Sequence, residues 1–159
     1  MKLRYLGLLS LAVLIAIPLS ANAAVLAYEA TLEASQEVPP NPSPATGSAT
    51  ISIDTDANTL TYTIMYSGLV GTETAAHIHG FAAAGTNAGV QHPLPAGNPK
   101  NGVWNYAEGD EASILAGLTY INIHTSDYPG GEIRGQIVES NSVAVEPTAW
   151  SGIKRFLEN

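Results

Sequence analysis

The sequence predicts an all-β protein with the architecture of an antiparallel sandwich or barrel. Short runs rich in Val, Ile, Thr and Tyr recur along the chain, and clusters of turn-forming residues separate them. Apolar and polar residues alternate within several of these runs, as they do in strands that bury one face. This combination is typical of an antiparallel sandwich or barrel.

The N-terminal residues predict a secretory signal peptide over residues 1–23. Lys2 and Arg4 precede an apolar run that ends at the small-residue site Ser20-Ala21-Asn22-Ala23. A bilayer-spanning helix needs about 20 apolar residues, so a cleaved signal is the better interpretation. We expect cleavage after Ala23, a secreted or periplasmic protein, and one domain over residues 24–139.

Composition excludes several classes of partner and site. After cleavage only four basic residues, Lys100, Arg134, Lys154 and Arg155, would face fourteen acidic ones. Nucleic acid and anionic membrane surfaces both require basic patches, so we expect neither as a partner. The chain has no cysteine, which excludes disulfides, thiolate metal ligands and a cysteine nucleophile.

Six segments have strand character. They are Val25–Glu33, Thr46–Asp54, Thr59–Ser67, Thr74–His79, Leu118–His124 and Glu132–Glu139. The turn residues Asp54-Thr55-Asp56-Ala57-Asn58 separate the second and third of them, which predicts a β-hairpin.

The remaining segments are predicted as loops or short helices. The proline-rich stretch 36–44 lacks the N–H donors that a continuous strand needs. The stretch 80–102, rich in Gly, Ala, Asn and Pro, is expected to be a long functional loop. Residues 108–115 favour one or two helical turns. Residues 140–149 are predicted as a linker, and 150–159 as a short amphipathic helical tail.

Histidines on two predicted strands point to the face opposite the isoleucines. His77 and His79 project from one face of a strand while Ile78 points to the other, because side chains alternate. His124 is likewise opposite in parity to the isoleucines of its own strand, and Arg134 is opposite to its neighbour Ile133. If the isoleucines fill the core, the histidines and the arginine stand together on the outward face.

The fourth histidine, His92, lies in the predicted long loop. We expect it to fold over the same face as a further metal ligand, which would use every histidine of the chain. A simpler interpretation stays open, in which the histidines are surface or hydrogen-bonded residues without metal. On the residues alone, Arg134 is as readily a surface salt-bridge residue as a catalytic one.

Three motifs resemble the CHRD (chordin-type) domain. They are Ala75-Ala76-His77-Ile78-His79-Gly80, Tyr120-Ile121-Asn122-Ile123-His124-Thr125 and Tyr128-Pro129-Gly130-Gly131-Glu132-Ile133-Arg134-Gly135. The resemblance extends from about residue 28 to residue 138. It implies a secreted protein with an immunoglobulin-like or superoxide-dismutase-like Greek-key β-sandwich. Many bacterial members of the family have no assigned activity, so the resemblance bears on fold more than on function.

The order of these residues is also similar to that of copper-zinc superoxide dismutase. That family has a His-x-His strand, a loop histidine followed shortly by a proline, a later strand histidine and an arginine near its last strand. The resemblance implies a copper site with His77, His79 and His124 as ligands and His92 as the loop ligand. It also implies that Arg134 is a catalytic residue that guides the anionic substrate, superoxide.

Two departures from the dismutase pattern limit what is expected. No histidine lies between His92 and His124, so the zinc subsite is missing, and so are the cysteines of the dismutase disulfide. We therefore expect one metal ion. Copper suits imidazole nitrogens and binds most tightly among divalent first-row metals, with zinc as the rival. Four histidines without an open position would store or carry the metal, whereas catalysis needs a vacant position and a redox-active ion.

Two functions remain open at this stage. One is an exported copper-binding protein, with or without superoxide dismutase-like activity, in which Arg134 either supports the metal ligands or guides the substrate. The negative net charge would repel superoxide at long range unless Arg134 supplies a local positive field. The other is a non-catalytic secreted module that binds protein or extracellular matrix. A serine hydrolase is disfavoured because the chain lacks a Gly-x-Ser-x-Gly elbow.

Overall fold

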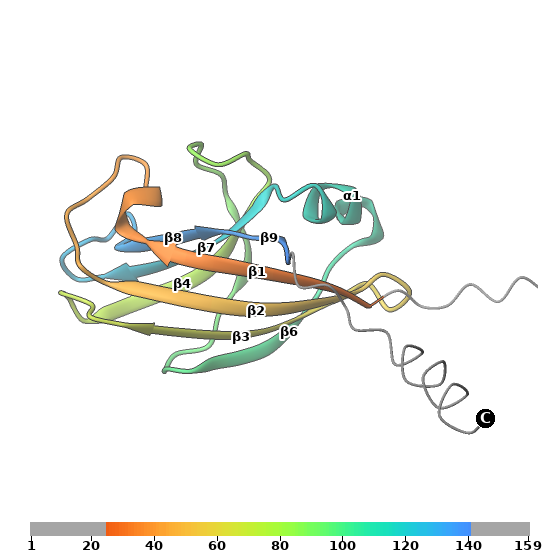
Figure 1. Cartoon of the computed structure of the whole chain (residues 1–159), viewed down its shortest axis with the longest axis horizontal. Helices are drawn as coiled ribbons and strands as arrows, with labels where there is room; N and C mark the ends of the chain where they lie inside the picture. The colour runs from red at the N-terminus through yellow and green to blue at the C-terminus, as the bar shows by residue number, and fades with distance from the viewer. Residues whose placement is uncertain (1–24, 141–159) are drawn as a thin grey trace, which may run out of the picture.

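The computed structural model describes residues 25–140, in which antiparallel strands dominate (Figure 1). The all-β prediction is confirmed. The predicted signal peptide, most of the predicted linker and the predicted C-terminal tail lie outside the described residues. Within residues 25–140 no helix is long and apolar enough to cross a membrane.

All six predicted strand regions contain strands with small shifts at their ends, but the sixth, Glu132–Glu139, is divided into two strands. The strands are β1 (Val25–Glu33), β2 (Thr46–Asp54), β3 (Thr59–Ser67), β4 (Glu73–Gly80), β5 (Val90–Pro93), β6 (Lys100–Asn105), β7 (Thr119–Thr125), β8 (Ile133–Gln136) and β9 (Val138–Glu139). The helical prediction over 108–115 also corresponds to real elements, a 3-10 turn η2 (Glu108–Asp110) and the helix α1 (Glu111–Leu115). A further 3-10 turn, η1 (Ala34–Gln36), follows β1.

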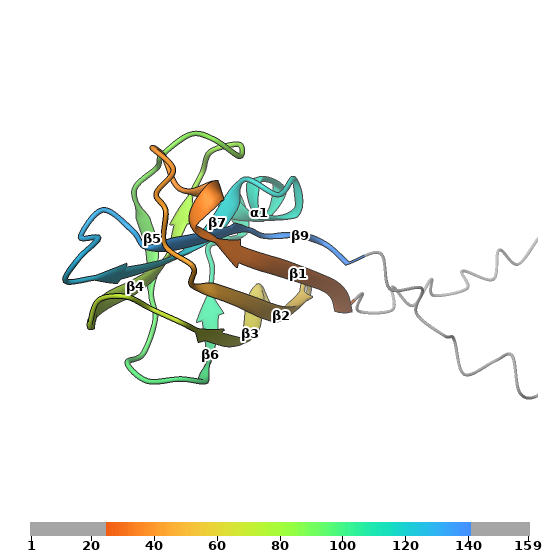
Figure 2. The ribbon, with the colours of Figure 1, turned by 60° about the vertical axis from the view of Figure 1, so that its left-hand side comes forward.

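The strands form one antiparallel sheet in the order β5-β4-β7-β8-β1-β2-β3-β6, with β9 paired to β1. The sheet curls on itself, so that β1, β2 and β3 lie across the interior from β4 and β7 (Figures 1 and 2). The chain crosses between the two layers after β5 and returns after β6, which is the Greek-key connectivity expected of a β-sandwich.

Isoleucines form much of the interior, as their parity predicts. Those of β2, β3, β4, β7 and β8 are all buried and belong to one cluster, namely Ile51, Ile53, Ile64, Ile78, Ile121, Ile123 and Ile133. Burying one such side chain stabilises the fold by about 1.5–3 kcal/mol. The core therefore fixes which face of β4, β7 and β8 is left for other residues.

The β2–β3 hairpin is confirmed, and its turn uses the residues that predicted it. The Oδ1 atom of Asp54 accepts hydrogen bonds from the backbone N–H groups of Asp56 and Ala57, at 3.0 and 2.9 Å. Asn58 closes the turn with a φ of 53°, a left-handed conformation that asparagine tolerates better than most residues.

The prediction of one long loop over residues 80–102 is wrong in part. The loop contains β5, which pairs with β4, and its end forms the start of β6, which pairs with β3. The glycine, asparagine and proline residues of this stretch are typical of loops, so the sequence did not indicate either strand. Gly102 has a specific packing role, because the phenol of Tyr62 occupies the space that any larger side chain there would need.

Candidate metal centre

Three histidines converge on the face of β4 and β7 that is turned away from the isoleucine core. Each of His77, His79 and His124 offers one ring nitrogen, and these three atoms all lie within 4.8 Å of one another. The ring centroids are 5.1–5.7 Å apart. The pairing of β4 with β7 produces this cluster, because it sets His77 opposite Asn122 and His79 opposite Tyr120, with His124 nearby on the same face.

One nitrogen on each ring is buried and has no hydrogen-bond partner: Nδ1 of His77, Nε2 of His79 and Nε2 of His124. The other nitrogen is held by a backbone carbonyl in two of the rings. His79 Nδ1 lies 3.0 Å from the oxygen of Ala88, and His124 Nδ1 lies 3.0 Å from the oxygen of Pro129. A carbonyl only accepts, so Nδ1 carries the hydrogen and Nε2 presents its lone pair to the cluster.

The surroundings of the cluster favour the neutral form of its histidines. Burial lowers the pKa of His77, and the neighbouring His79 lowers it further. Burial is also the main cause of the lowered pKa of His79 and of His124. Neutral imidazole is the form that binds a metal ion, so these rings need little deprotonation before they act as ligands.

A family model identifies the domain that carries this cluster. The CHRD domain model matches residues 28–137, which include all three converging histidines. The chain belongs to the CHRD domain family. No significant match was found among curated proteins or solved structures. The predicted CHRD resemblance is therefore confirmed, while the similarity to copper-zinc superoxide dismutase stays a prediction.

His92 does not join the other histidines of the CHRD domain, contrary to the expectation that its loop folds over them. It lies on β5, directly opposite Ile78 of β4, and paired residues point to the same side of a sheet. Its imidazole stacks on Trp104 at 5.8 Å between ring centroids and meets the ring of Tyr62 edge-on. The observed cluster thus has three histidines.

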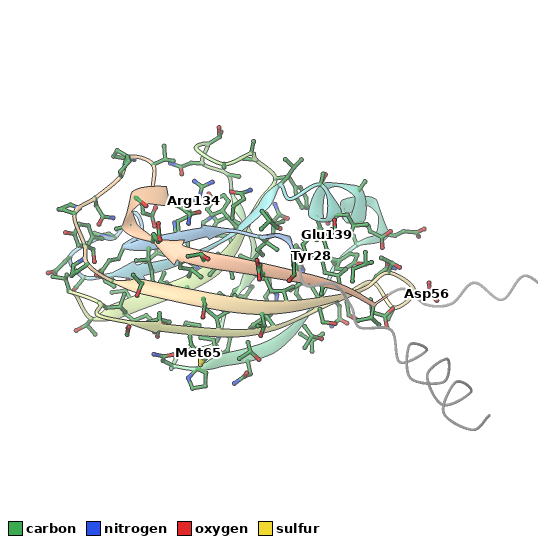
Figure 3. All side chains as sticks on the ribbon, in the orientation of Figure 1. Tyr28, Asp56, Met65, Arg134 and Glu139 are labelled. Atoms are coloured by element: carbon green, nitrogen blue, oxygen red, sulfur yellow. The ribbon has the colours of Figure 1, made fainter. Side chains whose placement is uncertain are left out.

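Arg134 has the predicted parity but is not exposed. Its side chain is only 1% accessible, and Figure 3 shows it beside the turn η1. The loop between β4 and β5 covers the face on which it stands. A solvent-facing arginine that steers an anion, or a surface salt bridge, is therefore not what the structure contains.

The surface beside His77 forms a pocket. A surface pocket of about 450 Å³ is bordered by His77, Ala75, Pro93 and Ala96, among other residues. Three protein ligands is the number found in catalytic zinc centres, which leave the fourth position to water or substrate.

Three contributors to the site were not predicted as such: the ring of Tyr120 and the carbonyl groups of Ala88 and Pro129. Tyr120 stacks on His79, with ring centroids 5.0 Å apart and an angle of 7° between the planes. Its shared parity with His124 was the only sequence signal for it. The two carbonyls carry no signal, because any residue type supplies a backbone oxygen.

Proposed function

We propose that this CHRD protein binds one copper ion through His77, His79 and His124. The observation that carries the proposal is the convergence of three histidines with ring nitrogens within 4.8 Å of one another, each ring having one buried nitrogen without a hydrogen-bond partner. Leaving a buried acceptor without a partner costs about 1–3 kcal/mol, and a metal ion would satisfy all three at once. The carbonyls that fix the rings of His79 and His124 are the usual outer partners of metal-binding histidines.

Copper fits the donor set better than the alternatives. Three imidazoles suit copper, zinc and nickel, and affinity in the first row peaks at Cu²⁺. No carboxylate belongs to the cluster, which disfavours hard cations such as Ca²⁺ and Mg²⁺. Zinc is the rival, and direct competition between the two metals separates them.

The charge distribution favours a cation as cargo. Lys100 and Arg134 are the only lysine or arginine in residues 25–140, and both are fully or almost fully buried. Lys100 Nζ is paired with Glu73 at 2.5 Å. The described surface thus carries acidic groups without exposed lysine or arginine, which attracts metal cations and repels superoxide.

Superoxide dismutase-like redox activity is the second candidate. The set of three protein ligands favours it, because three ligands leave a coordination position for the substrate of an inner-sphere reaction. The buried Arg134 and the acidic surface oppose rapid capture of an anion. We therefore place copper binding first and dismutation second. CHRD domains are typically extracellular, which agrees with an exported copper protein.

The test loads the purified full-length protein with Cu²⁺, challenges it with a weak chelator, and measures the copper that remains. We expect one copper per chain in the wild type and in His92→Ala, and none in the double variant His77→Ala/His124→Ala. An equimolar Cu²⁺/Zn²⁺ competition should leave copper bound. Loss of all copper from the wild type would end the proposal and favour a non-catalytic binding module. A superoxide assay on the loaded protein tests the second candidate.

A further inference from the structure

Tyr120 connects the histidine cluster to the buried arginine. Its ring is nearly parallel to that of His79, and the guanidinium carbon of Arg134 lies 3.5 Å from the centre of the same ring. β7 runs between β4 and β8 in the sheet, so Tyr120 lies between the histidine and the arginine. A cation over an aromatic face stabilises by about 0.5–2 kcal/mol, most when it is shielded from water.

The backbone of Ala88 is the point where this layer meets the loop above it. The N–H of Ala88 donates to the hydroxyl of Tyr120 at 2.9 Å. The carbonyl of Ala88 accepts from His79 Nδ1 at 3.0 Å and lies 3.3 Å from the Tyr120 hydroxyl. The orientation and tautomer of the His79 ring therefore depend on where Ala88 is held.

Arg134 holds the residues just before Ala88. Its guanidinium donates to the carbonyl of Thr86 at 2.9 Å and to Oδ1 of Asn87 at 3.2 Å. The amide of Asn87 in turn donates to the carbonyl of Val38. We call Thr86–Gly89 the roof segment. Its side chains are mostly exposed, so buried side chains of the roof segment itself contribute little to its position.

We propose that Arg134 is a positioning residue for His79, acting through Tyr120 and the roof segment. It fixes the roof segment by two hydrogen bonds and presses the Tyr120 ring against His79. Ala88 then keeps the hydrogen of His79 on Nδ1 and leaves Nε2 free for the metal. This role differs from guidance of a soluble anion, for which the guanidinium is too buried. Its consequence for metal affinity rests on the proposed copper function, but its effect on the metal-free protein does not.

The test is the tautomer of His79 in the metal-free full-length protein, measured by nitrogen-15 NMR of the imidazole rings. His124 is an internal control, because its Nδ1 is held by Pro129 rather than by the roof segment. In Arg134→Met we expect the Nδ1–H tautomer of His79 to lose its dominance and that of His124 to persist. An unchanged His79, or an equal change in both rings, would overturn the proposal.

Two milder variants keep the proposal testable if Arg134→Met does not fold. Asn87→Ala removes an exposed acceptor of Arg134, and Tyr120→Phe removes the hydroxyl that binds Ala88 while it keeps the stacked ring. Each should shift the His79 tautomer in the same direction, and a wild-type tautomer in both would contradict the proposal. With Cu²⁺ as the probe, Arg134→Met should lower the affinity about 10–100-fold, the usual effect of losing an outer partner. Thr50→Glu, an exposed change on β2 that lowers the net charge by the same amount, should leave tautomer and affinity unchanged.

Discussion

His77 and His92 lie on adjacent strands, yet their imidazoles occupy opposite faces of the sheet. His92 is paired with Ile78, so it shares the side of that core residue, while His77 shares the side of His79. Three of the four histidines therefore form the cluster, and the fourth, His92, packs against aromatic rings on the other face. Their functional roles should separate accordingly.

His92→Ala should affect stability and leave metal binding unchanged. The ring packs against Trp104 and Tyr62, and its removal opens a gap between them. We expect a loss of about 1–2 kcal/mol in the free energy of unfolding, measured by urea denaturation, with copper stoichiometry unchanged. A variant that folds normally but no longer retains copper would show that His92 is a ligand.

Glu37→Gln should change how stability depends on pH. Glu37 is 5% exposed, and its Oε1 and the Oδ1 of Asn122 are buried without partners, both close to Gly131. Burial raises the pKa of Glu37 to about 7, although the charge of Arg134 opposes the shift. A proton on Glu37 would also supply the donor that the two acceptors lack.

The direction in which stability changes with pH follows from the raised pKa of Glu37. The folded protein binds this proton more tightly than the unfolded chain, whose Glu37 titrates near 4.5. The contribution is complete below about pH 4.5 and is lost as pH rises to about 7, by roughly 3–3.5 kcal/mol in total. Glutamine mimics the protonated acid, so Glu37→Gln should be more stable than wild type at pH 8, with a flatter pH profile. Equal slopes for the two proteins between pH 5 and 8 would refute the assignment.

Glu132→Gln should be strongly destabilising. This fully buried carboxylate accepts hydrogen bonds from Ser43 Oγ and Val70 N, each at 2.6 Å, and from Thr125 Oγ1 at 2.7 Å. These donors, with a longer one from Gly71, hold the pKa of Glu132 below its usual value despite its burial. An amide nitrogen in place of one oxygen would face donors it cannot accept from.

We expect Glu132→Gln to lower the free energy of unfolding by about 2–4 kcal/mol, measured by urea denaturation at pH 7. The exposed Glu108→Gln, which makes the same chemical change, is the control and should stay within about 0.5 kcal/mol of wild type. A similar small effect at both positions would mean that the Glu132 network does not hold the loops around it.

Most of what could be predicted from the sequence came from strand parity, the alternation of side chains between the two faces of a strand. It placed Ile78 and Ile121 in the core and set His77, His79 and His124 on one opposite face, as the structure has them. Parity works within a strand because alternation is fixed by backbone geometry. It therefore predicted three members of the cluster without any knowledge of the loops.

The position of His92 could not be predicted, because β5 is short and contains no clear alternation. Its pairing register with β4 decides which face His92 takes, and a shift of one residue reverses the answer. The burial of Arg134 could not be predicted for another reason. It depends on the backbone path of the loop above it, whose contacts run through carbonyl oxygens that no residue type marks.

The most direct test of the account is a count of the imidazoles bound to copper. Electron paramagnetic resonance and nitrogen hyperfine spectra of the Cu²⁺-loaded full-length protein should show three coordinated imidazoles. The spectrum should be the same in His92→Ala and should lose one imidazole or collapse in His124→Ala. A fourth imidazole that disappears in His92→Ala, or a spectrum indifferent to His124→Ala, would contradict the three-histidine centre.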